Sequence, residues 1–389
     1  MMRFCFLLMI VAICCLPAQA TPYLPKDDQQ VLEHLPLRND TTQREFRRLR
    51  QILIAQPDNL RAATELAQHY IDAARNDGDP RYLGYAQAAL KPWWSLIQAP
   101  VPVLVLRATL RQSTHQFPAA LDDLNAVLKQ DRDNAQAWLT RATILQVQGR
   151  FAEAKASCMH LYPLAPELVT LTCISNIGSL NGDAAASYTT LHKIYDKNRD
   201  ADPGIRIWVL TLLAEISARR GDATAAENRY RDAMSLAIPD SYLLGSYADF
   251  LLDQHRPADV IALLKNKTKV DALLLRYALA LQVQHSPAAD QISLLDQRFE
   301  AAMLRGDTVH QREQARFELQ LKNRPEVALK LAQLNWAIQK EPADLRIYLE
   351  AAAASKNLEA AAPAIAWLRQ NRLEDIALAP LLNKLGVKQ

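Results

Sequence analysis

The sequence predicts an all-α protein built from short helix pairs that stack one on the next. The chain repeats itself, because nearly the same pattern occurs twice between Leu104 and Leu161 with a constant separation, 138 − 104 = 34 residues. Glycine is scarce, 10 residues in 389, where ~7% is usual. Half of the residues are hydrophobic and alanine is abundant, which favours helices joined by short turns. The recurring residues are Leu104, Arg107, Ala108, Phe117, Ala120, Leu124 and Val127 in the first copy, and Trp138, Arg141, Ala142, Phe151, Ala154, Cys158 and Leu161 in the second.

This period, with a small residue early, an aromatic residue after the turn and a second small residue three places on, resembles the tetratricopeptide repeat (TPR). The resemblance implies helix–turn–helix units in a right-handed superhelical solenoid of about nine pairs, ended by a C-terminal capping helix. The leader, the turn at Gly78–Tyr82 and the Pro92–Trp94 run are also similar to secreted TPR proteins of proteobacteria. That second likeness implies no particular activity.

Residues 1–20 are predicted to be a signal peptide. Arg3 supplies a positive charge, the apolar run Phe4–Leu16 follows, and small residues at 18 and 20 match the cleavage pattern. The apolar run is shorter than the ~20 residues of a membrane-spanning helix. We expect cleavage after Ala20 and a periplasmic or secreted mature chain with no membrane insertion.

Three of the five cysteines lie in the predicted signal peptide. A lipoprotein acylated at Cys14 or Cys15 is an alternative to cleavage, although Ile13 stands where acylation motifs prefer a small residue. Cys158 and Cys173 remain in the mature chain, and in an oxidising compartment two cysteines suggest one disulfide. The TPR resemblance places them on helices that pack together, which makes a bridge plausible. The alternative is two buried thiols.

Residues 21–59 are expected to form a leader and an N-terminal half-repeat. A helix over Thr41–Gln56 carries apolar residues on one face and ends before Pro57. The first full pair spans roughly 60–100, and the turn residues at 76–82 make its connection a longer, defined loop. Pro92 falls inside its second helix, where we expect a kink.

The solenoid is expected to occupy residues 60–376, with a cap at 377–389. The central pairs are the clearest, and the last two are weaker matches that still keep the interval. One second helix is expected to run long, to about Arg305, and a terminal helix is expected over Glu374–Leu385. After the first pair, the pairs begin near residues 101, 135, 168, 207, 241, 271, 309 and 343.

Arg107 and Arg141 stand where the commonest TPR unit carries leucine. An arginine in a packed seam needs a partner. TPR variants with Arg-Ala followed by Ala-Leu-x-Asp-Leu imply that Asp123 is the partner of Arg107. The second copy has Ser157 in place of the aspartate, so our hypothesis is that Asp123 serves both arginines. A ligand-binding role for Arg141 is the alternative.

No catalytic motif is evident. The 8 histidines are never closer than 25 residues, so no HExxH motif exists, and His310 with Glu313 offers too few ligands for a metal. Walker A, GxSxG, SxxK and GxGxxG patterns are missing from the sequence. The net charge of +3 gives no sign of a concentrated basic patch. We therefore expect no enzyme, cofactor, metal or nucleic-acid partner.

In TPR stacks the first helix of each pair lines the concave face, and exposed side chains there contact the partner. The corresponding residues here are mixed in charge and rich in amides and hydroxyls, which favours hydrogen bonding to an extended peptide. We expect an exported scaffold or adaptor that binds another protein in this groove. The alternatives are an envelope enzyme or glycan-handling subunit with a polysaccharide in the groove, and a lipid-anchored assembly factor. The expected contact residues are Thr109, Gln112, Thr143, Gln146, Asn176, Glu215, Asp249 and Asp253.

Overall fold

The computed structural model describes residues 40–307 and 309–387. The predicted signal peptide, its cleavage site after Ala20 and the alternative acylation sites Cys14 and Cys15 lie outside these residues. The chain divides into two compact units, Met1–Arg47 and Arg48–Gln389, and the boundary falls within helix α1 (Thr41–Ala55). The description that follows concerns the second unit unless stated otherwise.

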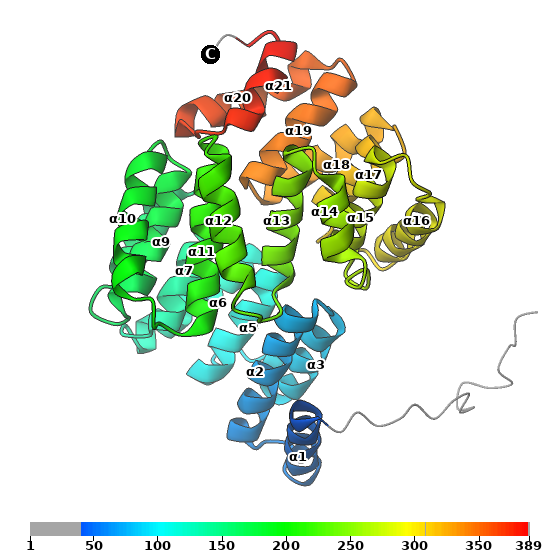
Figure 1. The fold of residues 1–389 in the computed structure, drawn as a ribbon. Helices are drawn as coiled ribbons and strands as arrows, with labels where there is room; N and C mark the ends of the chain where they lie inside the picture. Colours follow the sequence, from blue (N-terminus) through cyan, green and yellow to red (C-terminus); the bar gives the residue numbers. More distant parts are fainter. Residues whose placement is uncertain (1–39, 308, 388–389) are drawn as a thin grey trace, which may run out of the picture. The chain divides into compact units, whose positions relative to one another are not determined.

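The described secondary structure is entirely helical, and its helices pair in consecutive order (Figure 1). Each pair also contacts the next, which confirms the expected all-α stack of TPR-like helix pairs. None of the described helices is long and apolar enough to cross a membrane. The nine pairs in the described residues are α2 (Leu60–Asp77) and α3 (Arg81–Ala89), α5 (Val101–Ser113) and α6 (Phe117–Gln130), α7 (Ala135–Val147) and α8 (Phe151–Met159), α9 (Glu167–Ser179) and α10 (Ala184–Lys197), α11 (Pro203–Arg219) and α12 (Ala223–Met234), α13 (Ser241–Asp253) and α14 (Pro257–Leu264), α15 (Asp271–Val283) and α16 (Ala289–Leu304), α17 (Gln311–Gln320) and α18 (Pro325–Ile338), and α19 (Pro342–Ala354) and α20 (Leu358–Asn371).

Alanine and leucine form the seams between the helices. The small residues Ala108, Ala142, Ala214 and Ala248 are at most 1% exposed. Isolated helices shorter than ~12–15 residues are marginal in water. The helices of the stack that are this short therefore depend on contacts with their neighbours. Burial of apolar surface contributes ~25 cal/mol per Å², and here it comes from the neighbouring pair as well as from within each pair.

Two proline positions explain where the helices depart from a simple pair pattern. Helix α3 ends at Ala89, and α4 (Lys91–Trp94) begins with Pro92 in its first turn, which is the expected kink. At the other end, the expected single helix over Glu374–Leu385 is divided into the 3₁₀ turn η2 (Ile376–Leu378) and α21 (Ala379–Lys384). A proline at the start of α21 supplies no backbone N–H there, which suits the first turn of a new helix.

A disulfide joins two adjacent pairs. Cys158 on α8 and Cys173 on α9 are bonded, with their Cα atoms 5.8 Å apart. Both side chains are buried in the same apolar cluster. The bond closes a loop of 15 residues and contributes on the order of 3 kcal/mol in the chain-entropy model.

A buried ion pair ties the first clear repeat together. Arg107 donates from Nε and Nη2 to the Asp123 carboxylate at 2.9 and 2.7 Å. Its Nη1 donates to the carbonyl oxygens of Trp94 and Leu96, which fixes the segment after α4. The second arginine on Asp123 is Arg111, at 2.7 Å.

Arg141 takes a different partner from the one hypothesised. Its Nη1 donates to the hydroxyl of Ser157, the residue at the position of Asp123 in the second copy. Its guanidinium also lies 6.0 Å from the ring centroid of Trp138. Asp123 lies on the preceding helix, α6, and accepts from Arg107 and Arg111, so the sharing of Asp123 by Arg107 and Arg141 is not what the structure shows.

Replacement of Asp123 by asparagine should destabilise the protein by about 3–5 kcal/mol, because it leaves the buried Arg107 charge without its counter-ion. Chemical denaturation measures the change. Asp122→Asn, one residue away and exposed, is the matched control and should change stability by less than about 0.5 kcal/mol. Equal effects of the two substitutions would contradict the structural role of the pair.

Candidate functional site

Residues from the C-terminal end cover the turns of three central pairs. The turns within α7–α8, α9–α10 and α11–α12 contain Gly149, Gly182 and Gly221, with φ of 75°, 84° and 83°. This left-handed conformation favours glycine. The atoms that an added Cβ would meet belong to Trp367 at Gly149 (2.9 Å), Arg372 at Gly182 (3.1 Å) and Ile376 at Gly221 (3.1 Å).

Hydrogen bonds join the same regions. The Lys340 backbone N donates to the carbonyl oxygen of Val147 at 2.7 Å. The Ala184 backbone N donates to Oε1 of Glu374 at 3.1 Å, across 190 residues of sequence. Because Asp183 makes no side-chain cap bond to α10, Glu374 satisfies one of the N–H groups that a helix start leaves without an intrahelical acceptor.

A bidentate ion pair adds a third kind of contact. Arg346 on α19 donates from Nη1 and Nη2 to the carboxylate of Asp253 on α13, at 2.7 and 2.8 Å, across 93 residues of sequence. Its Nε donates to Glu350 at 2.8 Å. We call the contacts of Lys340, Arg346, Trp367, Arg372, Glu374 and Ile376 with the central pairs the C-terminal closure.

The C-terminal closure also has an apolar core. Buried residues of α7–α9 and of α17–α21 form one continuous cluster. The partly buried ring of Trp367 packs against this cluster, edge-on to Trp336 at 5.2 Å and tilted against Phe151 at 5.9 Å. The last two helix pairs therefore pack against the central pairs as well as against their neighbours in sequence.

The helices form a concave cavity of about 490 Å³ that is partly open to solvent. Its wall comes mainly from the first helices of seven consecutive pairs, α7, α9, α11, α13, α15, α17 and α19. Polar and charged side chains share this wall with aromatic and aliphatic ones, such as Leu180, Leu212 and Ile347. The inner face of the stack is thus a bounded space, with residues from both ends of the run of pairs on its surface.

Arginine–carboxylate pairs fix much of the cavity wall. Asp249 on α13 accepts from Arg276 and Arg316, each at 2.5 Å. Burial opposes its ionisation, but the two guanidinium groups hold the pKa of Asp249 well below its usual range. On α17, Arg312 pairs with its neighbour Glu313 at 3.2 Å and with Glu341, the N-cap residue of α19, at 3.0 Å. These pairs connect α13, α15, α17 and α19 across the cavity.

Six of the eight residues expected to contact a partner line this cavity, namely Thr143, Gln146, Asn176, Glu215, Asp249 and Asp253. Thr109 and Gln112 do not. They lie on α5, whose pair precedes the ones reached by the C-terminal closure, and the Thr109 hydroxyl donates to the carbonyl oxygen of Val105 in its own helix at 3.1 Å. Asp249 and Asp253 face the cavity with their carboxylates already bound by arginines.

Sequence reasoning did not single out the arginines on the later helices. Arg276, Arg312, Arg316 and Arg346 all line the cavity. The 34-residue repeat could have identified two of them, because 346 − 312 = 34 places Arg312 and Arg346 at the same position of successive repeats. The last pairs match the repeat pattern only weakly, so this correspondence was not evident.

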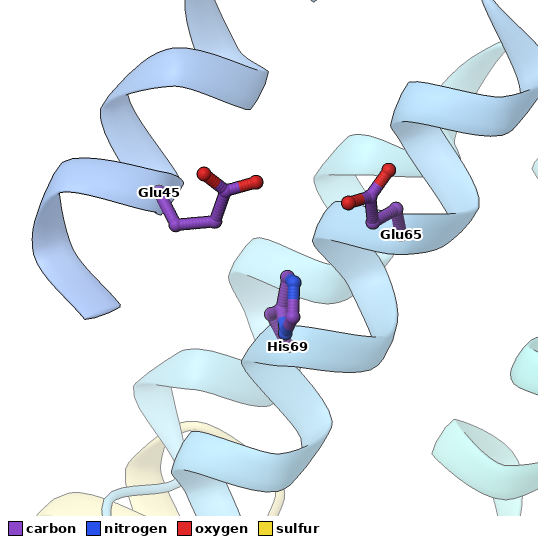
Figure 2. A group of neighbouring side chains, drawn as sticks. All are labelled: Glu45, Glu65 and His69. Carbon is purple, nitrogen blue, oxygen red and sulfur yellow. The ribbon is translucent and has the colours of Figure 1, made fainter. Parts of the chain in front are cut away.

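Helix α2 carries a carboxylate and an imidazole on one face. Figure 2 shows Glu65 and His69 four residues apart on this helix. Glu45, which the figure also labels, belongs to α1 in the other unit, Met1–Arg47. Within the second unit Glu65 faces Arg48 at 3.6 Å. Two ligands are fewer than the three or four protein ligands of a zinc site.

The other candidate metal residues have different partners. His310 lies 3.9 Å from the Asp307 carboxylate, and the Glu313 carboxylate accepts from Arg312. Glu313 is thereby part of the cavity's ion pairs, and burial is outweighed by that neighbour, so the pKa of Glu313 is lowered.

No protein-family model and no curated protein sequence matches the chain. Solved structures that it is similar to include a tetratricopeptide repeat protein from Parabacteroides merdae, 13% identical, covering 73% of this chain and 98% of that one, with a TM-score of 0.38. A monomeric mutant of IFIT1 is 15% identical and covers 88% of this chain and 85% of that one, with a TM-score of 0.42. Yeast Tom70 is 12% identical and covers 84% of this chain and 88% of that one, with a TM-score of 0.26. The helix pairing and the buried alanine and leucine seams described above establish the fold.

Replacing Gly149 by alanine should destabilise the protein more than the same change at Gly306. Both glycines have positive φ, 75° and 69°, where an L-residue costs roughly 1–2 kcal/mol. Only at Gly149 would the new methyl group also press on Trp367, which should add about 1–3 kcal/mol, while nothing lies within 4 Å at Gly306. Denaturation of the two variants measures the difference. Equal losses of stability would show that the turn is not covered.

The stability of the protein should depend on the ionisation of Asp344. Its carboxylate accepts from the Glu341 backbone N and from Asn335 Nδ2, each at 2.8 Å. The Arg312 guanidinium, whose Nη1 lies 3.5 Å from Asp344 Oδ1, favours the charged form, but burial outweighs it and raises the pKa of Asp344 to about 6. A folded-state pKa above the unfolded value means that the native state binds the proton more tightly, so this contribution to stability falls as the pH rises from about 4 to about 6.

Asp344→Asn removes this titration. Between pH 4 and pH 7 the free energy of unfolding of the wild type should therefore decrease relative to that of the variant, by up to about 3 kcal/mol. Urea denaturation at a series of pH values measures both curves. Parallel curves would show that Asp344 titrates normally.

Proposed function

We propose that this protein is an exported, non-catalytic scaffold that binds an extended segment of another protein in its inner cavity. The observation that carries the proposal is the cavity wall, where the first helices of seven consecutive pairs direct hydrogen-bonding side chains into one bounded space. A backbone in extended conformation offers N–H and C=O groups at regular intervals, and amide and hydroxyl side chains satisfy both kinds. Gln146 and Asn176 are such side chains on two adjacent first helices. The Thr143 hydroxyl donates to the carbonyl oxygen of Leu139 at 3.0 Å and can still accept a hydrogen bond from a ligand N–H.

The size of the cavity favours a chain segment over a folded partner. Its volume of about 490 Å³ lies in the range of ~300–1,000 Å³ that is usual for ligand sites. A few residues of an extended chain fit such a space, and a folded domain does not. The rest of the partner would remain outside the cavity.

Two observations support export. The disulfide between Cys158 and Cys173 suits an oxidising compartment. The first residues carry the charge, apolar run and small residues of a cleavable leader. Mass spectrometry of the intact protein purified from its native cells tests this. A mass that begins at Thr21 is expected; a chain carrying acyl groups at Cys14 or Cys15 would contradict cleavage after Ala20.

A polysaccharide is the second candidate ligand. The observation in its favour is the presence of Trp208 and Tyr242 on the cavity wall, because sugars stack on aromatic rings.

Site-specific photocrosslinking in the native envelope distinguishes these ligands. A photoreactive amino acid replaces Thr143 or Gln146 in the cavity, and Lys155, an exposed residue of α8, is the control position. We expect one dominant protein to be captured from the cavity positions and not from Lys155. Capture of glycan alone from the cavity, or of the same protein from all three positions, would contradict the proposal.

A further inference from the structure

One carboxylate of the cavity has no basic partner. The carboxylates on α13, α17 and α19 that line the cavity all lie within 4 Å of an arginine. Among the described residues Glu215 on α11 has no arginine, lysine or histidine at that distance, and it lines the same wall. Arg219, one helical turn further on, donates instead to the Ser179 hydroxyl at 3.0 Å.

Asp375 is the other lining carboxylate without such a partner in the described residues, but it serves the backbone. Its Oδ1 accepts from the Ala377 N at 3.0 Å and caps η2. Burial raises the pKa of Asp375, so its charged form is disfavoured. Glu215 is therefore the carboxylate whose charge is left for a ligand.

A hydrogen-bonded chain holds Glu215 in place. The Ser246 hydroxyl donates to Oε1 of Glu215 at 2.8 Å, and the Tyr230 hydroxyl is 2.7 Å from the Ser246 oxygen. Tyr230 is 2% exposed, so the far end of this series of hydrogen bonds lies in the core. The serine bond occupies Oε1 and fixes the orientation of the carboxylate, whose acceptor capacity exceeds this one bond.

Two aromatic side chains and an unpartnered hydroxyl line the same part of the cavity wall as the carboxylate. Trp208, Thr211 and Glu215 follow one another at spacings of three and four residues, which places them on one face of α11. Thr211 lines the cavity, is 3% exposed, and its Oγ1 has no hydrogen-bond partner among the described residues. Tyr242 on α13 is 65% exposed and also lines the cavity, and the Glu215 carboxylate raises the pKa of Tyr242.

We propose that Glu215, Trp208 and Tyr242 form a subsite for a lysine or arginine side chain of the bound segment. This inference rests on the proposed function. A carboxylate binds an ammonium or guanidinium group through charge-assisted hydrogen bonds, and the faces of tryptophan and tyrosine attract the same cations. Thr211 supplies a further oxygen at the same face. The cavity thus selects a segment with a cationic residue at this position.

The test uses a random heptapeptide library without cysteine, N-acetylated and C-amidated so that only side chains carry charge. The purified protein is immobilised, and retained peptides are sequenced by mass spectrometry. Glu215→Gln is the test variant, because its amide oxygen can still accept from Ser246 and the fold is retained. Glu359→Gln, an exposed change on α20 outside the cavity, is the control. Thermal denaturation checks that both variants are folded.

We expect peptides retained by the wild type and by Glu359→Gln to be enriched in lysine or arginine, by about tenfold relative to Glu215→Gln, the size of effect that a hydrogen bond to a charged group provides. Retention without any enrichment would overturn the cation subsite and leave the proposed function standing. Enrichment that persists in Glu215→Gln would overturn the assignment to Glu215. Retention of no peptide at all would overturn both.

Discussion

The contact between the C-terminal helix pairs and the central turns is the constraint on which the cavity depends. Helix pairs of this kind contact only their neighbours in a simple linear stack, and the inner face then stays an open groove. Here Trp367, Arg372 and Ile376 lie over three successive glycine turns, and Lys340 donates to Val147. As a result α17 and α19, the first helices of the last two pairs, lie close enough to α13 for Arg316 and Arg346 to pair with its carboxylates.

This arrangement changes the electrostatics of the inner face. Arginines and carboxylates that would be separately hydrated in an open groove are paired across the cavity, so most of its charges neutralise each other. A pair partly removed from water recovers its desolvation cost only where geometry is good, as where Asp249 accepts from both Arg276 and Arg316. Against this neutralised wall, the unpaired carboxylate of Glu215 is distinctive, and selectivity for a ligand's charge would come from it.

Local patterns predicted the helices well because the physics of each pair is local. The 34-residue interval, Pro92 and the alanines at the seam predicted the stack, the kink and the buried faces. The partner of Arg107 also followed from its own repeat. The partner of Arg141 did not, since the choice between Asp123 and Ser157 depended on how neighbouring pairs pack and on Arg111 taking the remaining place at Asp123.

The C-terminal closure could not be predicted from the sequence alone, because it joins residues such as Val147 and Lys340, whose separation has no periodic signal. The sequence feature associated with it is the glycine at each of the three covered turns. Positive φ favours glycine there in any case, so these glycines did not indicate the closure. The cavity residues on the early pairs followed from helix periodicity. Those on the later pairs depend on the closure, and so the importance of Arg276, Arg312, Arg316 and Arg346 became visible only in the structure.

Hydrogen exchange of two backbone amides tests the C-terminal closure most directly. The N–H groups of Lys340 and Ala184 find their acceptors, Val147 and Glu374, only across this contact. If the helix pairs close as described, both amides exchange slowly, at rates comparable to those of amides inside α7 and α19. Exchange of both at the rates of unstructured peptide, with the helices still protected, would show an open stack and contradict the C-terminal closure.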